Sequence, residues 1–259
     1  MRTSDNYADE GPLVARQRLW ATSRREPPFD LIPWVLDHAE ILPGSTEHVL
    51  DLGCGNGRWL AALAEREHSG STVGADLSYG MLSSLGDHIP RTQIDATALP
   101  FRDDTFDVVL AAHMLYHVEN RQSALIECRR VLRPGGRMVA TSNGPKNNVE
   151  LLRMIESAVG GGWRMSVPHQ QRFGMHNGAE QLAASFESIE RYDCPVTQTI
   201  VTDPNALADY VASLEGVYAD QVDVDWSWVV KDVLHAASRA IEHDGAVRLT
   251  SAVGAFVCR

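Results

Sequence analysis

The sequence predicts an α/β protein built on a doubly wound, mostly parallel sheet. Between about residues 47 and 143, short apolar runs alternate with segments of helical periodicity. A turn with three glycines, Gly53, Gly55 and Gly57, separates the first apolar run from the first helical segment of this region. Such alternation implies a parallel sheet covered by helices on both faces. A glycine-rich turn between strand and helix lets the backbone approach a ligand closely.

The elements of this region follow one another without long connections. In chain order we expect a strand in HVLDLG, a helix in RWLAALAERE, a strand in TVGAD, a helix in SYGMLSSLGDHI and a strand in RTQIDA. The polar turn FRDDT then precedes the buried strand FDVVLAA, the helix NRQSALIECRRVL and the strand RMVATSN. We expect Gly135 and Gly136 to end that last helix as C-cap residues.

The flanking segments follow a different pattern. Residues 1–45 predict helices over 13–21 and 31–39, separated by prolines, which we interpret as an N-terminal helical cap. Residues 144–259 predict a helix over 149–159, extended chain over 186–202, helices over 205–214 and 226–241, and one last strand over 246–258. We expect all three parts, residues 1–45, 46–143 and 144–259, to form one integrated domain.

Composition and charge limit the classes of partner and the cellular compartment that we expect for this protein. The chain of 259 residues has a formal net charge of −11 at pH 7 and no basic cluster, so we expect no nucleic-acid partner. No apolar run approaches the roughly 20 residues of a membrane-spanning helix, and the first residues are too polar for a signal peptide. The four scattered cysteines indicate neither a zinc site nor a disulfide framework. We therefore expect a cytoplasmic protein without membrane contact, in an oligomeric state that the sequence leaves open.

The glycine turn narrows the choice of ligand. Its spacing differs from the dinucleotide pattern G-x-G-x-x-G, and no Gly-Lys-Ser/Thr follows it as in a nucleoside triphosphate loop. Asp51, inside the strand before the turn, would repel a pyrophosphate and attract an ammonium group. Asp76, at the end of the second strand, is placed to accept hydrogen bonds from both hydroxyls of a ribose. The site therefore requires a ribose and a positive charge, without phosphates.

Five segments, VLDLGCGNG, GADLS, IDATALPF, FDVVLAAHMLYHV and RVLRPGGRMV, occur in this order. Together they resemble the class I S-adenosylmethionine-dependent methyltransferases of the type 11-like, small-molecule group, over about residues 30–143. The resemblance implies a Rossmann-like, seven-stranded sheet with a cofactor-binding core over residues 46–143 and lid or substrate-cap insertions in residues 144–259. It implies methyl transfer from S-adenosylmethionine to an O, N or C atom of a small-molecule acceptor, with S-adenosylhomocysteine as product and a possible place in specialised metabolism.

The resemblance also assigns candidate cofactor contacts. Those for the methionine end and the ribose are Asp51, Gly53, Cys54, Gly55, Gly57 and Asp76. Those for the adenine are Leu77, Met81, Asp95 and the backbone N–H of Ala96. Those beside the sulfonium are Ala112 and His113. In the N-terminal segment LVARQRLW, Arg16 could meet the cofactor carboxylate.

Methyl transfer needs little catalytic machinery, because the sulfonium carries its own leaving group and the protein mainly aligns the reactants and excludes water. A general base is needed only if the acceptor arrives protonated. His113, directly after the fourth strand, is the first candidate and His117 the weaker second, although both could simply pack the end of the strand. Their i, i+4 spacing is also that of metal pairs, but no third ligand is evident and we expect no metal.

Further candidate bases are Tyr116, His169 and His176. Arg172 lies between the two latter histidines, in a segment that could contact a carboxylate or phosphate of the substrate or could form an ordinary polar lid. The nine acidic residues between Asp203 and Asp244 could steer a cationic acceptor or form a solvated face.

Two alternative functions stay open at this point. The core motifs specify cofactor binding, whereas the acceptor chemistry lies in the flanking segments, so an enzyme that binds the cofactor but catalyses a cyclisation or elimination fits the same motifs. A non-catalytic cofactor-binding protein would predict decayed glycines or a lost ribose acid, and neither is seen. Cys54 lies at an expected helix N-terminus, which could lower its thiol pKa, although a small residue is also required close to the cofactor.

Overall fold

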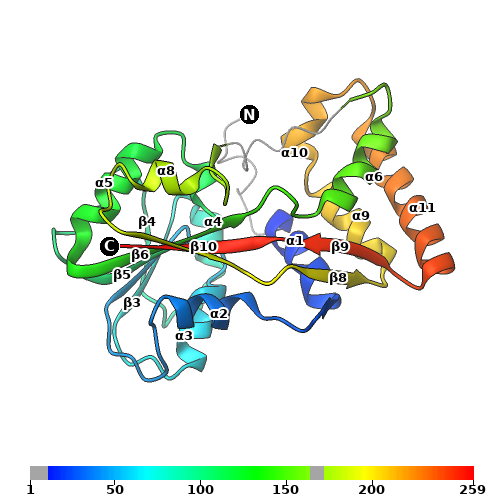
Figure 1. Ribbon diagram of the computed structural model, residues 1–259. Coiled ribbons are helices and arrows are strands. Elements are labelled where there is room, and N and C mark those ends of the chain that lie inside the picture. The colour runs from blue at the N-terminus through cyan, green and yellow to red at the C-terminus, as the bar shows by residue number, and fades with distance from the viewer. Residues whose placement is uncertain (1–10, 164–171) are drawn as a thin grey trace. The chain divides into compact units, whose positions relative to one another are not determined.

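The computed structural model describes residues 11–163 and 172–259 (Figure 1). Within these described ranges the chain forms two compact units. Unit 1 comprises residues 11–29, 146–163 and 195–252, and unit 2 comprises residues 30–145, 172–194 and 253–259. Each unit is therefore assembled from separate stretches of the chain. The expected division into residues 1–45, 46–143 and 144–259 stays a prediction.

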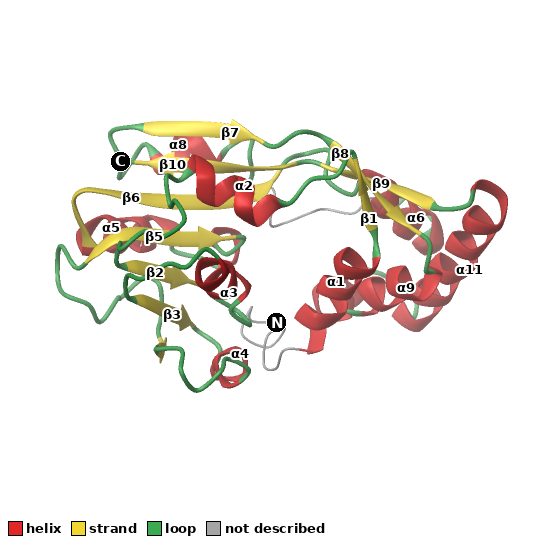
Figure 2. Ribbon diagram, turned by 90° about the horizontal axis from the view of Figure 1, so that it is seen from below, coloured by secondary structure: helices red, strands yellow, loops and turns green. Residues whose placement is uncertain are grey.

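Within its described residues, unit 2 contains a seven-stranded sheet with the strand order β4-β3-β2-β5-β6-β10-β7. Figure 2 shows its strands from β7 to β3 one below another in this order. Its strands are β2 (Val49–Leu52), β3 (Thr72–Asp76), β4 (Arg91–Gln93), β5 (Phe106–Ala112), β6 (Leu132–Asn143), β7 (Ile189–Asp193) and β10 (Val253–Cys258). The pairs β3–β4, β2–β3, β2–β5 and β5–β6 are parallel, whereas β10 runs antiparallel to both β6 and β7. The predicted doubly wound, mostly parallel sheet is confirmed.

Helices cover both faces of this sheet. One face carries α2 (Leu31–His38) and α3 (Arg58–Glu65), and the other carries α5 (Arg121–Val131) and α8 (Gly178–Leu182), as Figure 1 shows. Two short elements, α4 (Tyr79–Ser83) and η2 (Leu115–His117), follow β3 and β5. Side chains alternate along β5, so that Val108 and Leu110 pack with α2 and α3 while Val109 and Ala111 pack with α5. Apart from Asp107 near its start, the run FDVVLAA is apolar because both faces of the strand are buried.

The end of α5 differs from the expectation. The helix ends at Val131, and Leu132 already begins β6, so Gly135 and Gly136 lie inside that strand and not at a helix C-cap. Gly135 has a φ of +79°, and a Cβ on Gly136 would lie 3.0 Å from the carbonyl oxygens of Arg133 and Asp107. The two glycines therefore permit the irregular register between β5 and β6.

Unit 1 contains, within its described residues, a three-stranded antiparallel sheet with the order β1-β8-β9. Its elements are β1 (Arg24–Glu26), β8 (Thr197–Val201), β9 (Val247–Ser251), α1 (Gly11–Thr22), α6 (Val149–Val159), α9 (Pro204–Ala212), α10 (Glu215–Tyr218), η3 (Ala219–Gln221) and α11 (Trp226–Asp244). Side chains of Asp203 and Asp225 cap α9 and α11. The helices predicted near residues 13–21, 149–159, 205–214 and 226–241 are thus confirmed.

The last predicted strand, residues 246–258, is two strands in two different sheets. β9 belongs to the sheet of unit 1 and β10 to the sheet of unit 2, and Ala252 separates them. The sequence hides this change because residues on both sides of Ala252 are equally suited to extended structure. Among the residues that the structure describes, no helix combines the length and the hydropathy that crossing a membrane would need.

A buried arginine fixes the chain that leads into β2. Arg137 of β6 is 7% exposed. Its guanidinium donates to the main-chain carbonyl of Ala39, directly after α2, and forms an ion pair with the carboxylate of Glu47 at 2.7 Å. Because Glu47 lies two residues before β2, this pair helps to set where that strand enters the sheet.

We predict that Glu47→Ala lowers the free energy of unfolding by about 2–4 kcal/mol, because it leaves the guanidinium of Arg137 buried without a carboxylate. Denaturant unfolding measures this effect. The matched control is Glu65→Ala, which removes an exposed carboxylate at the end of α3 and should change the free energy by less than about 0.5 kcal/mol. Equal effects of the two substitutions would contradict a stabilising role for the pair.

Candidate functional site

The candidate site lies in unit 2, at the carboxyl ends of β2, β3 and β5. Because these three strands are parallel neighbours, the segments that follow them meet at one edge of the sheet. The segments are the glycine turn of residues 53–57, the connection from Asp76 into α4, and residues 113–117 with η2. The structure thus brings together the strand ends in which the sequence placed most of the candidate residues.

The glycine turn is bent back against β3. The N–H groups of Gly53 and Cys54 both donate to the carbonyl of Ala75, at 2.7 and 3.0 Å. Gly53 and Gly57 have φ values of +71° and +80°, and Gly55 has +53°. A Cβ on Gly53 would lie 2.6 Å from the Cβ of Met114, and a Cβ on Gly57 would lie 2.5 Å from a methyl group of Leu85. Both conformation and space therefore require glycine here.

Asp76 joins the turn to the end of β3. Its Oδ2 accepts a hydrogen bond from the N–H of Gly55 at 2.9 Å, and its Oδ1 accepts one from the N–H of Ser78 at 2.9 Å. A carboxylate oxygen has two lone pairs, so each oxygen of Asp76 can accept a further hydrogen bond. The two backbone donors hold the carboxylate in a fixed orientation at the edge of the sheet.

Asp51 is the most unusual residue of the site. Its side chain is fully buried in β2, and neither carboxylate oxygen has a hydrogen-bond partner among the described residues. Burial, together with the negative charge of Asp76, raises the pKa of Asp51 to about 8. A buried carboxyl group without a partner is costly. An ammonium group bound at this edge would supply the missing hydrogen bonds and the missing charge.

Cys54 is a buried, unreactive thiol. It is 5% exposed and packs with Leu60, Leu82 and Leu85. Burial raises its thiol pKa, and the charges of Asp51 and Asp76 raise it further. The helix N-terminus therefore does not produce a thiolate here, and the small side chain serves the packing beneath the turn.

The four residues predicted to contact an adenine follow β3 and β4. Leu77 is 55% exposed, whereas Met81 in α4 is fully buried. Asp95 is exposed, and its carboxylate accepts hydrogen bonds from the N–H and the hydroxyl of Thr97, each at 2.8 Å. Ala96, next to it, is buried. The cofactor contacts assigned to these residues stay predictions.

Arg16 lies in α1 and belongs to unit 1. Its guanidinium donates from Nε to the hydroxyl of Ser213 at 3.1 Å and from Nη2 to the carbonyl of Ser213 at 2.9 Å. These bonds tie α1 to the end of α9. The predicted contact of Arg16 with the cofactor carboxylate stays a prediction.

His113 lies directly after Ala112, the last residue of β5, in a strained conformation. Its φ is +53°, which is uncommon for a residue other than glycine. Its N–H donates to the carbonyl and to the hydroxyl of Thr141, at 3.2 and 3.1 Å. Burial and the positive charge of Arg58 lower the pKa of His113 to about 4, so the imidazole is neutral at pH 7.

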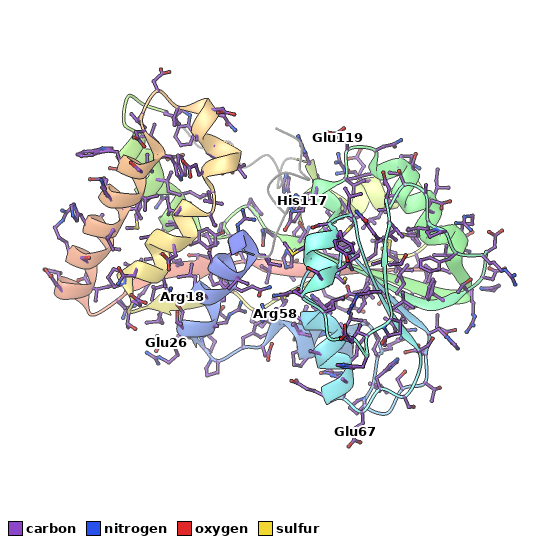
Figure 3. All side chains as sticks on the ribbon, turned by 180° about the vertical axis from the view of Figure 1, so that it is seen from behind. Arg18, Glu26, Arg58, Glu67, His117 and Glu119 are labelled. Carbon is purple, nitrogen blue, oxygen red and sulfur yellow. The ribbon has the colours of Figure 1, made fainter. Side chains whose placement is uncertain are left out.

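His117 and Tyr116 follow in η2. The ring of Tyr116 lies edge-on to that of His117, with centroids 4.5 Å apart, and 6.5 Å from that of His113. Because η2 begins only at Leu115, His113 and His117 are not on one helical turn, and the argument from their i, i+4 spacing is wrong. Figure 3 labels His117 and Arg58. In the described ranges, no three histidine, cysteine or acidic side chains are grouped as metal ligands would be.

The remaining candidate bases are His169 and His176, which flank Arg172 along the chain. His176 is exposed, just before α8, and Arg172 is also exposed. His169 lies outside the described residues. Sequence reasoning missed two residues that act on His113. Thr141 accepts hydrogen bonds from the N–H of His113, and the positive charge of Arg58 lowers the pKa of His113. A signal was available for both, because Thr141 lies near the carboxyl end of the strand beside β5 and Arg58 directly follows the glycine turn.

We predict that the pH dependence of stability in the ligand-free protein reveals the carboxyl group of Asp51. Its pKa rises from 3.8 to about 8 on folding, so the folded state holds an extra proton and becomes less stable as the pH rises through this range. His113, whose pKa falls from 6.5 to about 4, acts in the opposite direction but only below about pH 6.5. The window from pH 6.5 to 8 therefore separates the two groups.

In that window, the free energy of unfolding of the unsubstituted protein should fall more steeply with pH than that of Asp51→Asn, by up to about 1.4 kcal/mol per pH unit. Denaturant unfolding at a series of pH values measures both slopes. Asp87→Asn, which removes a fully exposed carboxylate, is the control and should leave the slope unchanged. Parallel curves for Asp51→Asn and the unsubstituted protein would refute the raised pKa.

Comparison with known proteins agrees with this geometry. Residues 50–140 match the family model described as a methyltransferase domain. The demethylmenaquinone methyltransferase of Lactiplantibacillus plantarum is 39% identical over 111 residues, which are 39% of this chain and 47% of that protein. The demethylmenaquinone methyltransferase of Mycobacterium tuberculosis is 43% identical over 98 residues, which are 37% of this chain and 41% of that protein. The chain thus spans less than half the length of these curated relatives.

Two solved structures share the fold. A protein of Anabaena variabilis, provisionally described as a methyltransferase from an antibiotic biosynthesis pathway, has a TM-score of 0.65 at 13% identity, over 88% of this chain and 97% of its own. The YcgJ protein of Bacillus subtilis has a TM-score of 0.53 at 17% identity, over 87% of this chain and 96% of its own. At these identities the likeness establishes the fold alone. Residues 50–140 of this chain are therefore similar to methyltransferase domains, and its seven-stranded sheet has the fold of these solved structures.

Proposed function

We propose that the protein transfers a methyl group from S-adenosylmethionine to an O, N or C atom of a small-molecule acceptor. The observation that carries this proposal is the carboxyl group of Asp51, which is fully buried and lacks a hydrogen-bond partner in the described part of the chain. It lies beside a turn whose glycines let a ligand approach the backbone. The ammonium group of the cofactor's methionine end matches this carboxyl group in charge and in hydrogen bonding.

The residues at the edge of the sheet fit the rest of the cofactor. Asp76 retains lone pairs on both carboxylate oxygens, which suits the two ribose hydroxyls. The remaining proposed contacts are Gly53, Cys54, Gly55 and Gly57 for the methionine end, Leu77, Met81, Asp95 and Ala96 for the adenine, and Ala112 and His113 beside the sulfonium. When bound, the sulfonium supplies a methyl group that a nucleophile can displace.

His113 is the proposed catalytic residue, and His117 is the weaker second candidate. A neutral imidazole can accept a hydrogen bond or a proton, but a pKa of about 4 makes His113 a weak base. We therefore infer that it accepts a hydrogen bond from the acceptor and aligns the nucleophile, and does not remove a tightly held proton. The hydrogen bonds from its N–H to Thr141 fix its backbone for that task.

The proposal includes the cellular compartment of the reaction and the class of acceptor. All four cysteines are free and buried, which is compatible with a reducing cytoplasm. The net charge of −11 supports an acceptor other than nucleic acid. Demethylmenaquinone, named for two relatives, is one acceptor to test, although the segments that flank the matched region decide acceptor choice. A place in specialised metabolism stays a prediction.

We predict that Asp76→Ala weakens S-adenosylmethionine binding by about 1–3 kcal/mol, because the ribose hydroxyls lose their acceptors. Titration calorimetry measures the affinity. Asp87→Ala removes an exposed aspartate outside the site and should leave the affinity unchanged. An Asp76→Ala protein that binds the cofactor as tightly as the unsubstituted chain would refute the assignment of the ribose.

The methyl transfer itself is tested by mass spectrometry. The protein is incubated with S-adenosylmethionine and an extract of its source cells, or with demethylmenaquinone. We expect S-adenosylhomocysteine together with a product that is heavier by one methylene unit. Tight cofactor binding with conversion of a substrate but no S-adenosylhomocysteine would instead support the cyclisation or elimination alternative.

We predict that His113→Ala lowers the turnover number in this assay by about tenfold to a hundredfold, because the acceptor loses its alignment. Cofactor affinity, measured by calorimetry on the same variant, should change by less than about twofold. His243→Ala, which removes an exposed histidine at the end of α11, is the matched control and should leave the turnover number unchanged. Equal losses of turnover and cofactor affinity in His113→Ala would show that His113 is a cofactor contact only.

A further inference from the structure

Arg121, the first residue of α5, is a partly buried arginine that has only neutral partners. Its Nε donates to Oε1 of Gln181 at 2.9 Å, and its Nη1 donates to the carbonyl of Val118 at 2.7 Å. Within the described ranges, no ion pair joins it to a carboxylate, whereas Arg130 and Arg137 of the same unit both bind carboxylates. Removing a guanidinium from water without supplying an anion is unfavourable.

The position of Arg121 in its helix adds to this cost. The amino end of a helix carries a partial positive charge, which disfavours a cation and favours an anion. Asn120 caps the helix by accepting a hydrogen bond from the N–H of Ser123, and an uncharged cap leaves the positive end unneutralised. A cation at this place is therefore disfavoured unless an anion joins it.

A second arginine lies close enough to repel Arg121. Burial, and then the positive charge of Arg172, lowers the pKa of Arg121. Gln181 connects the two arginines, because its carboxamide accepts from Arg121 and donates to the main-chain carbonyl of Arg172 at 2.9 Å. The guanidinium of Arg172 is exposed and, within the described residues, forms no ion pair. Gln181 thus links the guanidinium of Arg121 to the backbone of Arg172, the residue whose charge acts on it.

Nearby acidic residues do not compensate for the pair. Glu119 is exposed at the surface of the molecule (Figure 3). Glu180, in the first turn of α8, is also exposed. Neither forms an ion pair with Arg121 or Arg172 in the part of the chain that the structure describes. The two arginines therefore present an uncompensated positive charge on a protein whose net charge is −11.

The pair lies next to the candidate site along the chain. Val118, whose carbonyl accepts from Arg121, directly follows His117 in η2. The segment that connects β5 to α5 thus carries His113 at one end and the anchor of Arg121 at the other. A ligand group held by the arginines would belong to a molecule that reaches the strand end of β5.

We propose that Arg121 and Arg172 form a binding site for an oxyanion, the carboxylate or phosphate group of the acceptor. Planar guanidinium groups match the spacing of carboxylate and phosphate oxygens, and such charge-assisted hydrogen bonds are stronger than neutral ones. A bound oxyanion would neutralise both arginines and the amino end of α5. Naming the ligand as the acceptor rests on the proposed methyl transfer, whereas the affinity for an oxyanion does not.

The test uses the full chain with inorganic phosphate and, separately, acetate, at constant ionic strength and neutral pH. The Nε–H signals of Arg121 and Arg172 are followed by nuclear magnetic resonance. We expect saturable shifts with at least one of the two anions, and the tighter anion indicates whether the acceptor is phosphorylated or carboxylated. Arg172→Gln should weaken this binding by at least about tenfold. Arg129→Gln removes an exposed charge from the same helix and should weaken it by less than about twofold.

A charge reversal separates ligand binding from a structural role. Arg172→Glu should abolish anion binding while leaving the unfolding midpoint unchanged or higher, because it gives Arg121 a carboxylate partner. A protein in which neither anion causes saturable shifts, or in which Arg172→Gln and Arg129→Gln lose binding equally, overturns the proposal. Calorimetry with S-adenosylhomocysteine keeps the two proposals apart. A chain that binds this cofactor product but no anion refutes only the oxyanion site, and one that binds anions but not the cofactor product refutes only the proposed function.

Discussion

The burial of a carboxyl group at the carboxyl end of β2 is the constraint on which the site depends. Asp51 is surrounded by the sheet and its helices, so its charge is poorly solvated and Asp76 adds a second negative charge nearby. Without a ligand the favourable response is to keep the proton, which the raised pKa expresses. A cationic ligand reverses this preference, and the same interaction therefore links ligand affinity, protonation and stability in unit 2.

The strained backbone conformations of the site lie in the segments around this carboxyl group. The glycine turn adopts positive φ values, and His113 does so without being a glycine. Such conformations persist only when the surrounding structure holds them. Here the hydrogen bonds to Ala75 and Thr141 and the packing against Met114 and Leu85 provide that support. The sheet beneath, apolar on both faces, supplies a rigid base from which these groups project.

Charge is distributed unevenly in this protein. The chain as a whole is acidic, and most of the partly buried arginines of unit 2 are neutralised by carboxylates, as Arg137 is by Glu47. Arg121 and Arg172 depart from that pattern. The proposed cofactor site thus has the carboxyl group of Asp51 in β2, whereas Arg121 begins α5 after the β5–α5 connection and Arg172 lies before α8. In our proposals, this arrangement orients the cationic cofactor at Asp51 and an anionic group of the acceptor at Arg121 and Arg172.

The sequence by itself determined the parallel core of unit 2, the glycine turn and the two aspartates, because periodicity, glycine spacing and strand ends are local properties of the chain. It also predicted most helices of unit 1. Only the tertiary structure decided that residues 246–258 form two strands in two sheets, that α5 ends before Gly135, and that His113 and His117 do not share a helical turn. It also decided the raised pKa of Asp51, the lowered pKa of His113 and the contact of Gln181 with both Arg121 and the backbone of Arg172. These properties depend on burial and on charges from distant parts of the chain, which no local pattern records.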